Sequence, residues 1–204
     1  MSPFNGASVL HFQAELSNRH LAVVEYYNQN NNGFGTLLAF PPSPTDGSPA
    51  FGSSTANDPS NPAVQRGIWW FDDNHPSHKK PRYNQYRFSP KGMYSLSAFT
   101  HGEDNAASRD LDGNWAGKVT HPSGAPGNDV LLVWSPGPVN LLNRPTNKPA
   151  LDAGIYLIPD GVPLTDHKEL VIIKNDPDYN ETQPKPVVTY RDIYGIDEPA
   201  RLPW

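Results

Sequence analysis

Cysteine is absent from this chain of 204 residues. Its absence excludes disulfides, thiolate zinc sites, cysteine nucleophiles and covalent haem attachment through CxxCH within this chain. Basic clusters are also scarce, since the longest is KKPR at residues 79–82 and the formal net charge is −5. Proteins that bind nucleic acids need clustered Lys and Arg against the phosphates, so no nucleic-acid partner is expected.

Long apolar runs are lacking as well. No stretch is long enough to span a bilayer, so the sequence predicts no membrane span in this chain. Residues 1–6 show neither the basic nor the apolar part of a signal peptide. Helical windows are scarce, because Pro or Gly interrupts almost every stretch of helical length.

Prolines, glycines and aromatic residues are what the chain does have. It holds 23 Pro and 16 Gly, which predict many turns, and 5 Trp, 9 Tyr and 8 Phe, which can build a core. A unit of short strand, polar turn and short strand recurs three times, pairing residues 9–15 with 20–27, 82–88 with 93–100, and 118–121 with 130–135. A short β unit repeated along a chain favours a repeat architecture such as a β-propeller.

Local sequence phrases carry a family resemblance. FSPKGMYS at 88–95 resembles the SPDG hairpin of TolB-like propellers, and GIYLIPDG at 154–161 resembles their dIYv…DG strand and turn. Together with EYYN at 25–28 and VWSPG at 133–137, they resemble the propeller-type middle domain of hydrazine synthase alpha subunits and their bacterial relatives. The resemblance implies a secreted or periplasmic multidomain protein. The haem motifs of that subunit are absent here, so its activity is not carried over.

The expected fold is therefore all-β and forms part of a β-propeller. At roughly 45 residues per blade, the length supports about four blades of antiparallel meanders. A closed propeller needs more blades than this, and strands are predicted close to both ends of the chain. We therefore expect the chain to be a fragment of a longer one. We expect one domain over residues 1–204, with an exposed Pro/Ser/Gly-rich insertion at about 41–62 that lacks regular structure.

The sequence contains two candidate metal sites. His75 and His78 lie close together in an acidic segment, and imidazoles with carboxylates can bind transition metals. A proline separates them, so a solvated loop is favoured. Asp110, Asp112 and Asn114 alternate like the oxygen ligands of a calcium loop. The full twelve-residue pattern is missing, so a plain Asp-Gly turn is favoured and neither a metal nor another cofactor is expected.

Catalytic motifs are not found. No G-x-S-x-G elbow and no phosphate-binding G-x-x-x-x-G-K-[ST] loop occurs in the chain. His101 could work in acid–base catalysis with Glu103 and Asp104, although adjacent charges on a loop are more often simply exposed.

The function expected from these residues is a non-catalytic propeller scaffold or interaction module. It would belong to a larger bacterial exported protein, periplasmic or extracellular, with other domains or proteins as partners. One alternative is an enzyme with a site in the propeller channel, which would use His101 or His121 with nearby carboxylates. A second alternative is a carbohydrate-binding module that stacks sugar rings on exposed aromatic residues. The candidates for such stacking are Tyr26, Tyr27, Trp69 and Trp70. For these residues, packing in the hydrophobic core is the favoured role.

Overall fold

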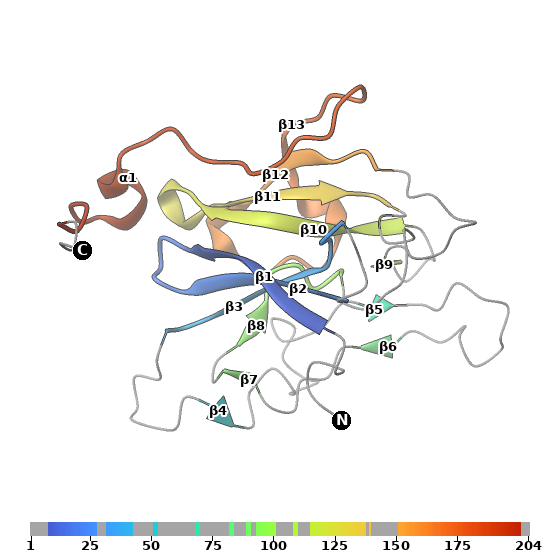
Figure 1. The fold of residues 1–204 in the computed structure, drawn as a ribbon, viewed down its shortest axis with the longest axis horizontal. Coiled ribbons are helices and arrows are strands. Elements are labelled where there is room, and N and C mark those ends of the chain that lie inside the picture. Colours follow the sequence, from blue (N-terminus) through green and yellow to red (C-terminus); the bar gives the residue numbers. More distant parts are fainter. Residues whose placement is uncertain are drawn as a thin grey trace, which may run out of the picture.

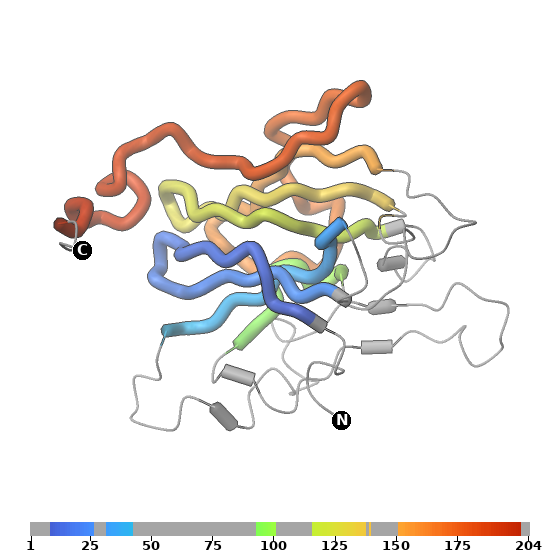
Figure 2. The backbone as a smooth tube through the Cα atoms, viewed as in Figure 1, coloured from blue at the N-terminus to red at the C-terminus, as the bar shows by residue number. Residues whose placement is uncertain are grey.

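A computed structural model describes residues 8–27, 32–42, 93–100, 115–137, 139 and 151–200 of the chain. It also gives the backbone of two-residue strands at 51–52, 68–69, 82–83, 89–90 and 108–109. These parts form antiparallel sheets and one short helix (Figure 1), so the all-β prediction is confirmed. The tube in Figure 2 shows the two larger sheets stacked one above the other.

The first sheet has the order β1-β2-β3-β8. Its strands are β1 (Ser8–Glu15), β2 (Leu21–Tyr27), β3 (Thr36–Phe40) and β8 (Tyr94–Ser95). β1 pairs with β2 across a tight turn, which confirms the first predicted hairpin. β2 is central and is buried on both faces, since Ala22 and Val24 enter the main core while Val23 packs with Leu38 and Met93 on the other side.

The second sheet has the order β13-β12-β11-β10-β9. Its strands are β9 (Ser108–Arg109), β10 (Trp115–Gly124), β11 (Val130–Ser135), β12 (Gly154–Ile158) and β13 (Val171–Lys174). The 3-10 turn η4 (Pro126–Asn128) joins β10 to β11, and this pairing confirms the third predicted hairpin. Two further 3-10 turns follow β12, η5 (Pro159–Gly161) and η6 (His167–Glu169), and the helix α1 (Tyr190–Tyr194) lies near the end of the chain.

Two pairs of short strands complete the described backbone. β4 (Phe51–Gly52) pairs with β7 (Ser89–Pro90), and β5 (Ile68–Trp69) pairs with β6 (Arg82–Tyr83). β4 lies inside the insertion predicted to lack regular structure, so that prediction was wrong for these two residues. Within the described part of the chain, no helix is long and apolar enough to cross a membrane.

The second predicted hairpin was wrong. Of residues 93–100 only Tyr94–Ser95 form a strand, and it pairs with β3 instead of residues 82–88. Ser97 then bridges in parallel to Leu164, next to the second sheet. The turn at 89–92 favours a local hairpin, but pairing with β3 brings Met93 against Val23 and Leu38 in a buried cluster. Tertiary burial therefore decided the partner of this segment.

Buried hydroxyl groups attach residues 93–100 to β3. Ser97 Oγ accepts a hydrogen bond of 2.8 Å from the backbone N–H of Leu37 and lies 2.8 Å from Thr100 Oγ1. The hydroxyl of Thr36 lies 3.4 Å from Ser97 Oγ and 3.5 Å from Ser95 Oγ. All these hydroxyls are buried, and buried polar groups are tolerated when they are hydrogen-bonded to one another.

One core connects the two sheets. It contains Val24, Leu37 and Leu96 from the first sheet region and Val119 and Leu132 from the second, each at 1% exposure or less. Neither sheet closes on itself among the described strands, so they form two open sheets packed through a shared core.

A backbone bridge also joins the sheets at Gly35. Its N–H donates to the carbonyl oxygen of Val119 at 2.9 Å, and the N–H of Val119 donates back at 3.1 Å. A Cβ atom on Gly35 would lie 1.8 Å from the carbonyl oxygen of Glu25. Only glycine therefore fits where the two sheets meet.

We expect Gly35→Ala to lower the free energy of unfolding by about 3 kcal/mol, because the methyl group would overlap backbone that cannot easily move. Gly127→Ala is the matched control, since a Cβ there meets nothing within 4 Å. Its positive φ of 72° should cost only about 1 kcal/mol. Urea unfolding of both variants measures the difference, and equal losses would contradict the steric role of Gly35.

Candidate functional site

Of the residues predicted as candidates for a catalytic or metal site, the structure describes only His121. His101, the metal candidates His75 and His78, and the calcium candidates Asp110, Asp112 and Asn114 lie outside the described residues. Among the residues that are described, no group of three or more His, Asp or Glu side chains is placed to hold a metal ion. The candidate functional site is therefore His121 and the described residues around it.

His121 lies at a β-bulge in β10, where the register with β11 shifts between Thr120 and Ser123. Its φ of 46° is in the left-handed region, which few residues other than glycine adopt. Phe12 lies at an equivalent bulge in β1, where the register with β2 shifts between His11 and Ala14, and its φ is 51°. Bulges redirect side chains and are common beside functional sites.

The two bulges bring the rings of Phe12 and His121 together. Their centroids are 4.1 Å apart and their planes are inclined by 42°. The His11 ring lies 4.7 Å from that of Phe12 with the planes inclined by 37°, and its Nδ1 lies 3.1 Å from the hydroxyl of Tyr26. Tyr26 itself packs against the main core, so the core role favoured for this aromatic residue is confirmed.

Two small cavities share His121 as a wall. The larger, about 190 Å³, lies between Phe12, His121 and the extended chain at Gln183. The smaller, about 150 Å³, lies on the side of Phe34 and Asn180. Neither cavity is lined by an Asp or Glu among the described residues. The carboxylate partner that the enzyme alternative expected beside His121 is therefore not found in the described part of the chain.

The electrostatics at His121 favour a neutral imidazole. Burial lowers the pKa of His121 below its usual value, and the nearby His11 lowers it further. Its Nδ1 lies 3.3 Å from Thr120 Oγ1. A neutral ring can donate one hydrogen bond and accept another, whereas a charged ring would only donate.

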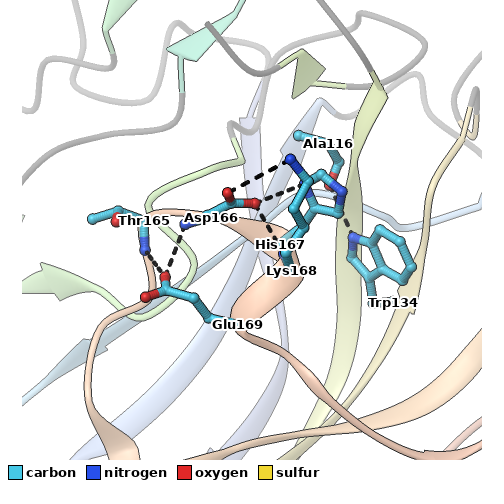
Figure 3. A network of polar contacts seen from close by, with 7 residues as sticks. All are labelled: Ala116, Trp134, Thr165, Asp166, His167, Lys168 and Glu169. Atoms are coloured by element: carbon cyan, nitrogen blue, oxygen red, sulfur yellow. Dashed lines mark hydrogen bonds and ion pairs between the residues drawn. The ribbon is translucent and has the colours of Figure 1, made fainter. Parts of the chain in front are cut away.

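A second cluster surrounds His167, which the sequence had not singled out. Its ring stacks on Trp134 at 5.5 Å with an angle of 14°, and its Nδ1 lies 3.3 Å from Asp166 Oδ1. Figure 3 shows how the turn holds this arrangement: Asp166 caps η6 by accepting from the backbone N–H of Lys168, and Glu169 accepts from the backbone N–H of Asp166. The stacking of His167 on Trp134 connects η6 to the second sheet, and Trp134 is itself held there because its Nε1 donates to the Ala116 carbonyl at 2.9 Å.

Buried charges form another feature that the sequence did not reveal. Lys118 is fully buried and Glu25 is 5% exposed, and both take part in interactions. Buried lysines are rare unless paired. The signal in the sequence was a Lys among mostly apolar and hydroxyl-bearing residues of a strand, a pattern that also fits an exposed position.

Comparisons of the chain with family models, with curated proteins and with solved structures give no match. The resemblance to TolB-like propellers and to hydrazine synthase alpha subunits therefore stays a prediction.

We expect the protein to lose stability as the pH falls from about 7 to about 5. Burial lowers the folded-state pKa values of both His20 and His121. Between the lowered pKa and the unfolded value of about 6.5, the unfolded chain binds more protons, so acid favours unfolding. His121→Asn removes one of these groups, and asparagine tolerates a positive φ. Thermal melts across this range should therefore show a shallower pH dependence for the variant, and identical profiles would contradict the prediction.

Proposed function

We propose that the chain is a non-catalytic β scaffold, part of a β-propeller in a larger bacterial exported protein, which holds other domains or proteins. The observation that carries this proposal is the exposed apolar strand β13. Its residues Val171, Ile172 and Ile173 are 45%, 59% and 55% exposed. Such a strand is suited to being covered by another part of an assembly.

The geometry of β13 favours a β-sheet as its partner. β13 pairs only with β12, so its outer side offers free backbone donors and acceptors within the described structure. Successive residues of a strand point to opposite faces, so the three exposed apolar side chains lie on both faces of the sheet. An exposed strand edge with apolar side chains on both faces recruits further strands, although the register of β13 with β12 shifts at Ile173.

We propose that another four-stranded antiparallel meander pairs with the edge of β13 and covers its apolar side chains. The described chain already contains two such meanders, β1-β2-β3-β8 and β10-β11-β12-β13, which share one core. Consecutive blades of a propeller are four-stranded sheets of this kind, and each blade covers the face of the next. The exported location follows from the family resemblance alone.

The surroundings of His121 also favour a scaffold over an enzyme. General acid–base catalysis by a histidine is usually supported by a second group that orients the ring. The described residues that interact with the His121 ring are Thr120, Phe12 and His11, and neither they nor the described lining of its two cavities supply a carboxylate.

We expect the chain of residues 1–204 to self-associate through β13 as its concentration rises, because an uncovered apolar edge can pair with a second copy. Ile172→Lys should lower the association by about tenfold or more, since a lysine on an edge strand blocks pairing. Analytical ultracentrifugation over a concentration series measures the change.

The matched control is Val187→Lys. Val187 is fully exposed and lies outside every strand, so this variant adds the same charge without touching the edge. It should associate like the unaltered chain. A chain that stays monomeric at all concentrations, or equal effects of both variants, would contradict β13 as the contact surface.

A further inference from the structure

Backbone strain gathers at the larger cavity beside His121. Among the described residues, six that are not glycine have a positive φ, and three of these line this one cavity. They are Phe12 with φ 51°, His121 with φ 46° and Gln183 with φ 52°. Each such residue costs of order 1–3 kcal/mol, and strain of this kind concentrates at ligand-binding sites.

The three strained residues come from three separate parts of the fold. Phe12 lies in the first sheet, His121 lies in the second, and Gln183 belongs to the extended chain after β13. No single turn or hairpin therefore accounts for the three conformations together. The cavity is the feature that they share.

Polar side chains around this cavity have no partner within the described part of the protein. Gln13, Gln183 and Lys185 are exposed, and the described structure gives none of their side chains a hydrogen bond or ion pair. They supply two amide groups and one ammonium group at the cavity. No Asp or Glu is among the described lining residues, although the whole chain carries a net charge of −5. Among the described lining residues, the ammonium group of Lys185 is therefore the one permanently charged group.

The remaining walls of the cavity are apolar. They are Phe12 and two buried proline rings, Pro122 and Pro184, beside the imidazole of His121. A volume of about 190 Å³ exceeds what one water molecule needs by an order of magnitude. Apolar walls with a few convergent polar groups are typical of small-molecule sites.

We propose that this cavity binds a small organic carboxylate with an apolar body. The carboxylate accepts hydrogen bonds from the Lys185 ammonium and from the amide of Gln13 or Gln183. The apolar body lies against the ring of Phe12 and the two prolines. Bound there, the ligand would contact the first sheet, the second sheet and the chain at 183–185 at once, so binding would stabilise the folded state as a whole.

The test uses benzoate and benzamide on the full chain. These two molecules share an apolar ring and nearly the same shape, but only benzoate carries a negative charge. Titration monitored by NMR should show saturable shifts at His121 and Gln183 with benzoate, and binding about tenfold weaker with benzamide. Benzoate should also raise the melting temperature. Absence of saturable shifts, or equal affinity for both molecules, would overturn the proposal.

Two variants locate the site. Lys185→Gln removes the proposed cation and should weaken benzoate binding by about tenfold while leaving benzamide binding unchanged. Lys168→Gln removes another exposed lysine, next to Asp166 and outside the cavity lining, and should leave both affinities unchanged. Equal losses for the two variants would show non-specific charge attraction and would overturn the site.

Discussion

The backbone bridge between Gly35 and Val119 is the constraint on which the arrangement of the two sheets depends. Two reciprocal hydrogen bonds join the start of β3 to the middle of β10. They are possible because Gly35 has no side chain to strike the carbonyl of Glu25. Val119 is completely buried at this point, so the bridge lies beside the shared core. His121 follows two residues later in the same strand, and its position opposite Phe12 therefore depends on this contact.

Buried polar groups also fix how distant segments of the chain are placed against one another, as the Gly35–Val119 bridge does. The hydroxyls of Thr36, Ser97 and Thr100 are buried and bonded to one another or to backbone. Each would carry a desolvation cost if it lost its partner, so together they permit one placement of residues 93–100. The capping box of η6 likewise fixes the turn that holds His167 against Trp134.

The β-bulges in β1 and β10 account both for the positive φ values of Phe12 and His121 and for the position of these two residues at the larger cavity. A regular pairing of β1 with β2 and of β10 with β11 would keep Phe12 and His121 in ordinary extended backbone. The extra residue at each bulge changes the backbone direction and places the two rings 4.1 Å apart. Conformations of this kind cost free energy and persist only where the surrounding structure holds them in place.

Local chemistry was enough to predict two of the three hairpins, β1 with β2 and β10 with β11. The apolar and β-branched runs in β2, β11 and β12 and the polar turns at 17–19 and 125–129 act over neighbouring residues, so the sequence alone determined an antiparallel all-β chain. The partner of Tyr94–Ser95, the burial of Lys118 and the meeting of Phe12 with His121 join residues far apart in the chain. Only the tertiary structure decided them, because burial and steric fit between distant segments outweigh the preference of each segment by itself.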